Sequence, residues 1–250
     1  MTHKIKEPPK IKKLNKKKIE ENLKKIDDGF SEKDHGRQCY ARYASFDYCF
    51  NYFQSLKNKK EIKSKQNMQN SCLHLGFYLA SWGMLRGSSF LLQKSIKFYK
   101  PIINYIADKD NNFWKLDVKD YNKEENVEKI IKCGEEIGKI LKEENRNKVS
   151  DIQITKIMLG VFGNIPAFDN YFKNGSGLKK FNKNSLKEIH KFYKKNKNIL
   201  EQEAKKIKTF DFNKINNIKK PVFTKRSYTV AKIIDMIFFT EGFLRSKIKK

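Results

Sequence analysis

The sequence predicts an all-α protein, a single multi-helix domain with a basic N-terminal arm. Apolar residues recur at three- and four-residue spacing through most of the chain, and alternating strand patterns are nearly absent. No internal repeat at the period of solenoid proteins is present. The 250 residues suffice for one sizeable core. We assign residues 1–30 to the arm and residues 31–250 to the helical domain, which has room for two helical lobes with a cleft between them.

The arm is rich in lysine, contains Pro8 and Pro9, and has a weak helical pattern only from Leu14 to Ile26. We expect a flexible arm or a loosely attached helix. In the domain, helical periodicity marks the segments 36–57, 70–99, 126–145, 151–159, 184–207 and 229–243. The second of these is hinged at Gly83 and Gly87, and Ser185 with Glu188 predicts a capping box at the start of the fifth. Residues 111–121 are the one plausible strand.

The net charge of +27 predicts attraction to nucleic acid or anionic lipid. The excess of lysine over arginine, with abundant Asn and Ile, is also what an A/T-rich genome imposes on any protein that it encodes. The charge alone therefore does not decide the function. The few arginines are more informative, because a bidentate fork was kept where lysine was the easier choice.

Several classes of protein are not indicated. The cysteines and histidines are scattered without a C-x-x-C pair or ligand spacing, so we expect reduced core cysteines, no metal site and no cofactor. The longest charge-free apolar run, Leu73 to Leu85, falls short of the roughly 20 residues of a membrane-spanning helix. No apolar segment follows the basic N-terminus, as a secretory signal would require. We expect a cytoplasmic protein with no membrane partner and no obligate protein partner.

One stretch departs from the lysine-rich texture of the rest, "ITKIMLGVFGNIPAFDNYF", residues 154–172. Gly160, Gly163 and Pro166 should break a helix here, and a second helix should restart with Asp169 in its first turn. At that position the helix dipole keeps a carboxylate ionised. Asp169 then either caps a tight helix–turn–helix or points into a cleft, while the glycine amides of the turn meet a phosphate.

This stretch resembles the DNA glycosylases of the helix-hairpin-helix superfamily, in particular the branch similar to 8-oxoguanine glycosylases, over residues 151–180. The resemblance implies that an apolar helix leads into a glycine-bearing hairpin that grips DNA, and that Asp169 is the catalytic carboxylate. It also implies contacts to the DNA backbone from Lys156, Gly160, Gly163, Asn164, Lys173, Lys179 and Lys180. Because no lysine of a recognisable hairpin is available for a Schiff base, we expect a monofunctional enzyme.

A glycosylase also needs a pocket for the extruded base. Trp82 and Arg86 lie one helical turn apart in "LASWGMLRGSSF", where they would share a face and offer a stacking plane and a hydrogen-bonding fork. We add Asp47 and Phe168 to this base pocket. The alternative is plain helix packing around Trp82, with Arg86 paired to Asp47, Asp169 or Asp235 inside the core.

We therefore expect a DNA-binding enzyme, most concretely a monofunctional DNA glycosylase that excises a flipped and modified base from double-stranded DNA, as in bacterial defence against phage. The alternative function is a non-catalytic helical module that binds DNA or RNA through lysine faces. A metal-dependent nuclease that uses Asp108 or Asp110 with Asp117 and Lys119 would need a sheet, and this region is too polar and too isolated to build one.

Overall fold

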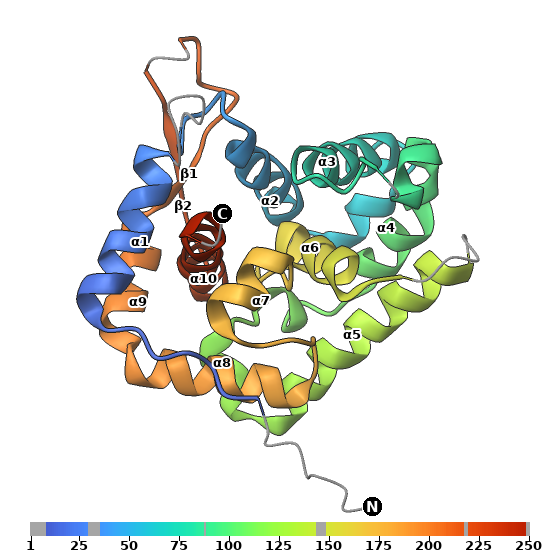
Figure 1. Cartoon of the computed structure of the whole chain (residues 1–250). Helices are drawn as coiled ribbons and strands as arrows, with labels where there is room; N and C mark the ends of the chain where they lie inside the picture. Colours follow the sequence, from blue (N-terminus) through green and yellow to red (C-terminus); the bar gives the residue numbers. More distant parts are fainter. Residues whose placement is uncertain (1–8, 30–35, 88, 144–148, 218–219, 249–250) are drawn as a thin grey trace, which may run out of the picture.

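The computed structural model describes residues 9–29, 36–87, 89–143, 149–217 and 220–248. Within these residues the protein is predominantly α-helical, as predicted, with a single short antiparallel sheet (Figure 1). The α-helices are α1 (Lys16–Asp28), α2 (Ser45–Ser55), α3 (Met68–Ser81), α4 (Lys100–Ala107), α5 (Glu124–Glu143), α6 (Asp151–Phe162), α7 (Asn170–Ser176), α8 (Lys183–Lys195), α9 (Lys197–Lys206) and α10 (Val230–Ile248). The strands are β1 (Lys208–Phe210) and β2 (Phe223–Ser227). Short 3-10 helices are η1 (Arg42–Ala44), η2 (Lys59–Lys63), η3 (Phe90–Gln93), η4 (Ile96–Tyr99), η5 (Phe113–Lys115) and η6 (Val118–Asn122).

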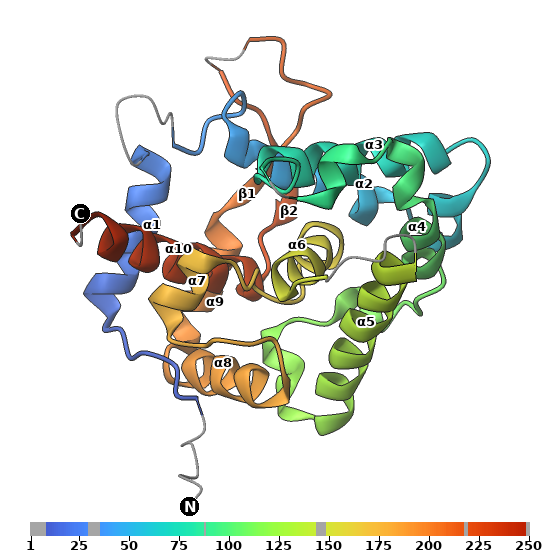
Figure 2. The ribbon, with the colours of Figure 1, turned by 45° about the vertical axis from the view of Figure 1, so that its right-hand side comes forward.

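Helix α6 and the chain that follows it run through the middle of the molecule. Every residue from Thr155 to Asp169 is buried. Helices α2, α3 and α5 pack directly on α6, and Figures 1 and 2 show them arranged around it. The buried apolar residues of α1 through α10 form one continuous cluster.

The predicted break is confirmed at Gly163, but Gly160 does not break the helix, because α6 continues through it to Phe162. The helix begins with a capping box, in which Ser150 accepts a hydrogen bond from the Gln153 amide and the Gln153 side chain accepts one from the Ser150 amide. It ends at Gly163, whose φ of 66° is in the left-handed region that favours glycine. The next helix, α7, begins at Asn170, so residues 163–169 form an extended joint between the two helices.

Helices α7 and α10 cross with their backbones in contact. A Cβ atom on Gly175 would lie 1.9 Å from the Phe238 carbonyl oxygen, and one on Gly242 would lie 1.9 Å from the Tyr171 carbonyl oxygen. No side chain larger than hydrogen fits at either position. This crossing fixes the short helix α7, and with it the residue that precedes α7, Asp169.

The described part of the N-terminal arm is more firmly attached than the sequence suggests. Ile19, Leu23 and Ile26 are buried, and α1 packs on α10. The Asn22 side-chain amide donates to the Ile237 carbonyl and to the Glu241 carboxylate, both at 3.2 Å. Ile19, Leu23 and Ile26 form a narrow apolar stripe on an otherwise lysine-rich helix, and the stripe is buried because it packs on α10. Residues 1–8 of the arm lie outside the described residues.

Other local predictions are wrong. Residues 111–121 form η5 and the start of η6 instead of a strand, and the strands form at 208–210 and 223–227. Helix α8 begins two residues before Ser185, and its N-cap is Asn182, whose side chain accepts a hydrogen bond from the Ser185 amide at 2.9 Å.

Asp117 has a structural role at the start of α10. Its carboxylate accepts hydrogen bonds from the amides of Val230 and Ala231 and so caps this helix.

Three further features bear on the function. No helix among the described residues is long and apolar enough to cross a membrane. The same residues contain no group of three His, Cys, Asp or Glu side chains that could hold a metal ion. All four cysteines lie among the described residues, are buried and form no disulfide bond.

The glycine crossing makes a stability prediction. We expect Gly242→Ala to lower the free energy of unfolding by about 2–3 kcal/mol, because the new methyl group must push α7 away from α10. Urea denaturation followed by circular dichroism measures this loss. Gly138→Ala is the control, since a Cβ there meets only the flexible end of Ile154 at 3.1 Å and alanine favours the helix. Equal stability of the two variants would contradict the crossing.

Candidate functional site

Asp169 is the N-cap of α7 and is held rigidly there. Its Oδ1 accepts from the Phe172 amide at 2.9 Å, and the residue is 8 % exposed. The joint that leads to it is tied on both sides: the Ala167 amide donates to Asp235 at 3.0 Å, and the Phe168 amide donates to the Thr155 hydroxyl at 2.8 Å. The carboxylate therefore occupies the positive end of a helix, as predicted, on a backbone with few degrees of freedom.

Lys156 connects Asp169 to Trp82. It projects from α6, is 4 % exposed, and places its Nζ 3.7 Å from Asp169 Oδ2 and 2.8 Å from the Trp82 carbonyl oxygen. Burial lowers the pKa of Lys156, and the charge of Asp169 opposes this shift. Burial likewise raises the pKa of Asp169, and Lys156 opposes it. This lysine, which we expected on the DNA backbone, thus lies inside the fold.

A second buried ion pair also lies close to Trp82. On α10, Lys232 Nζ is 2.9 Å from Asp235 Oδ2 and 4.6 Å from the ring centroid of Trp82. We call Lys156, Asp169, Lys232 and Asp235 the Trp82 charge cluster. Burying four charges costs several kcal/mol of desolvation per ion, which their pairing offsets only in part. Such clusters are concentrated at functional sites.

A small cavity borders the Lys232–Asp235 pair of this cluster, while Lys156 and Asp169 do not line it. Its volume is about 20 Å³, and its lining consists of Ile26, Arg37, Tyr43, Trp82, Tyr228, Lys232, Asp235, Met236 and Phe239. One water molecule needs about 10–15 Å³ on this measure, so the cavity admits little more than a single water. The walls combine aromatic rings with the Lys232–Asp235 pair.

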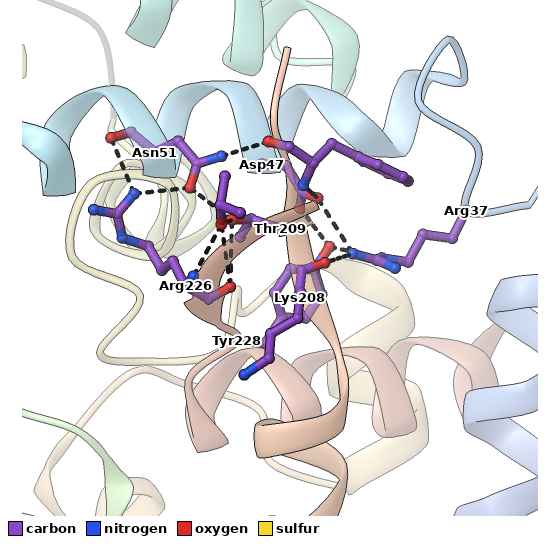
Figure 3. Close-up of polar contacts among 9 residues, drawn as sticks. Arg37, Asp47, Asn51, Lys208, Thr209, Arg226 and Tyr228 are labelled. Atoms are coloured by element: carbon purple, nitrogen blue, oxygen red, sulfur yellow. Dashed lines mark hydrogen bonds and ion pairs between the residues drawn. The ribbon is translucent and has the colours of Figure 1, made fainter. Parts of the chain in front are cut away.

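Asp47 lies behind this cavity in a hydrogen-bond network between α2 and the β1–β2 ribbon (Figure 3). The carboxylate is fully buried, accepts from the Phe210 amide at 3.0 Å and from the Tyr228 hydroxyl, and lies 3.4 Å from Arg37 Nη2. Arg37 also donates to the Lys208 carbonyl. Burial raises the pKa of Asp47, against the charge of Arg37. Asp47 was expected in the base pocket, but its carboxylate instead binds the β1–β2 ribbon and Arg37. Its partners Arg37 and Tyr228 line the cavity.

The other predicted pocket residues are not brought together. Helix α3 ends at Ser81 and Gly83 has a φ of 76°, so Trp82 and Arg86 do not share a helical face. Trp82 is half-buried at the cavity, whereas Arg86 is exposed and pairs with no carboxylate of the described residues. Phe168 is fully buried against Phe172 and Phe181.

Of the residues predicted to contact the DNA backbone, some are buried and others are exposed. Gly160, Gly163 and Asn164 are buried; the Gly163 carbonyl accepts from Thr229, and the Asn164 carbonyl accepts from Tyr121. A Cβ on Gly160 would lie 2.4 Å from the Tyr78 ring, so this glycine serves helix packing. Lys173 is half-buried, while Lys179 and Lys180 are exposed and accessible to a phosphate.

Lys232 and Arg37 were missed as site residues. A signal for Lys232 exists in the sequence, because it stands with Asp235 at i, i+3 spacing in the apolar segment "TVAKIIDMIFF". Arg37 has no comparable signal, since its partners are distant in the sequence. Comparisons of this chain with protein-family models, with curated proteins and with solved structures gave no match.

The Lys156–Asp169 pair makes a second prediction. We expect Asp169→Asn and Lys156→Met each to lower the free energy of unfolding by about 3 kcal/mol, because each leaves a buried charge without its partner. The double variant should lose less than the sum of the two, with a coupling of at least about 1 kcal/mol in a double-mutant cycle by urea denaturation. Additive losses would show that the two side chains do not interact.

Proposed function

We propose that this protein is a DNA-binding enzyme that hydrolyses an N-glycosidic bond, with Asp169 as its catalytic carboxylate. The observation that carries the proposal is the position of Asp169, a buried carboxylate fixed at a helix start, paired with Lys156 and connected through it to Trp82. A carboxylate kept rigid in a site with little water is suited to stabilising a developing positive charge.

The chemistry follows from that position. As the bond between C1′ and the base nitrogen breaks, the base leaves with the electron pair and the deoxyribose becomes an oxocarbenium ion. Asp169 stabilises this cation and accepts the proton of the water that adds to C1′. Lys156 holds the carboxylate in place and favours its ionised form, while Trp82 offers a plane against which an extruded base can stack.

Access for the base requires a movement. Ile26 of α1 and Trp82 both line the cavity of about 20 Å³. An extruded base would enter once one of these side chains has moved aside. Burial is the main cause of the lowered pKa of Lys156, and Asp169 and Asp235 oppose it. The exposed residues Arg42 and Arg86 lie close enough for their charges to lower this pKa further. They supply positive charge where a phosphodiester would approach.

A second candidate function is supported by the small size of the same cavity. A helical module that binds DNA through surface lysines, without catalysis, needs no open pocket. Lys16, Lys194, Lys195 and Lys197 line one basic hollow at the junction of α8 and α9 that suits such binding.

Asp169→Asn separates these two functions. For the glycosylase we expect this variant to release free base at least about 100-fold more slowly, since the charge that stabilises the cation is removed, while its affinity for DNA is kept. The substrates are genomic DNAs that carry different modified bases, with free base scored by mass spectrometry and abasic sites by alkaline cleavage. Asp108→Asn is the matched control, because this carboxylate is on the surface and paired with Lys63. Absence of free base from every DNA would favour the binding module.

The raised pKa of Asp169 makes a pH prediction. The reaction needs the carboxylate ionised, so base release should fall on acidification with a midpoint above 3.8, the ordinary aspartate value. Lys156→Met should move this midpoint to higher pH, because the cation that opposes the shift is removed. Single-turnover rates across pH measure both midpoints, with circular dichroism verifying the fold. A midpoint that does not move in the variant would contradict the role of the pair.

A further inference from the structure

A second hollow opens on the other side of the network in Figure 3, beside Arg226 instead of Arg37. Its volume is about 310 Å³, far larger than that of the cavity at Trp82. Helices α2 and α3 supply rings to its wall, and the β1–β2 ribbon supplies polar groups. None of its lining residues belongs to the Trp82 charge cluster.

The first wall of this hollow is a stack of rings. The His74 ring lies between the rings of Tyr48 and Tyr52, with centroids 4.3 and 3.9 Å apart and planes within 24°. Tyr48 also makes edge contacts with Phe77 at 6.3 Å and Phe212 at 5.2 Å. Tyr48 remains 40 % exposed and Phe77 57 % exposed. Contiguous exposed rings of this kind mark an interaction surface.

The second wall carries positive charge that no carboxylate neutralises. Arg226 Nη1 donates to Asn51 Oδ1 at 3.0 Å, and no carboxylate of the described residues pairs with this half-buried guanidinium. Lys59 does not line the hollow, but its pKa is lowered to about 8 by burial and, to a smaller extent, by the charge of nearby Arg226. The one acidic residue that lines the hollow, Asp211, is paired with Lys214 at 3.3 Å.

We propose that this hollow, together with the exposed Phe77 ring beside Tyr48, binds single-stranded DNA, with one base stacked on Tyr48, a neighbouring base stacked on Phe77 and the adjacent phosphate at Arg226. Exposed rings beside an unneutralised cation are the combination that unpaired strands require, since every base has a face that can stack. A duplex cannot use the rings, because its bases are already stacked on one another. The site is separate from Asp169 and does not depend on the chemistry proposed there.

The decisive variant is Phe77→Ala, because a side chain so exposed can be removed with little effect on folding. Fluorescence anisotropy with labelled oligothymidine should show a loss of affinity of about fivefold to tenfold, the effect of one lost stacking contact. A hairpin duplex of the same length should bind with unchanged affinity. Tyr48→Ala should lose a similar factor, and Tyr48→Phe, which keeps the ring, should not. Leu92→Ala removes a comparably exposed apolar side chain outside the hollow and is the control.

Arg226→Gln tests the phosphate contact. We expect it to reduce the slope of log affinity for the single strand against log salt by about 0.7, the value for one phosphate contact. An unchanged affinity of Phe77→Ala for oligothymidine, or an equal loss for the duplex, would overturn the proposal. Failure of the proposed function gives a different result: the unmodified protein then releases no base, while its binding of oligothymidine still depends on Phe77.

Discussion

The buried ion pair of Lys156 with Asp169 is the interaction on which the arrangement of the site depends. Two opposite charges are each less than a tenth exposed, and only their mutual contact and a few hydrogen bonds compensate for the lost water. The Trp82 carbonyl accepts a hydrogen bond from the Lys156 ammonium group, and the Phe172 amide donates one to the Asp169 carboxylate. Helices α3, α6 and α7 therefore cannot shift independently without leaving a charge unpaired.

Helix α10 supplies the surroundings that make this pair possible. Its glycine lets α7 approach to backbone contact, its Asp235 takes the Ala167 amide of the joint, and its Lys232 lies against Trp82. The first turn of α10 is in turn capped by Asp117. Helix α1 packs on the same helix and brings Ile26 to the cavity, so the basic N-terminal segment contributes one wall residue of the cavity.

The β1–β2 ribbon separates two environments of different chemistry. On one side, hydrogen bonds and an ion pair join Asp47, Arg37 and Tyr228 to one another, next to the small cavity beside Trp82. On the other side, the Arg226 guanidinium donates to the neutral Asn51 beside a wide hollow that Tyr48 lines. Thr209 lies between the two and donates to Asn51, so α2 and the ribbon behave as one rigid unit (Figure 3).

The sequence by itself determined what depends on neighbours along the chain. Helical periodicity, the break at Gly163 and the place of Asp169 at a helix start follow from local backbone preferences, which act over a few residues. Only the tertiary structure decided which charges meet. Lys156 reaches Asp169 because residues 163–169 fold back over α6, and Asp47 pairs with Arg37 instead of the expected Arg86. Arg86 stays exposed because α3 ends at Ser81, before the left-handed Gly83. The energy of a buried charge depends on partners that are distant in the sequence, and residue spacing carries no record of them.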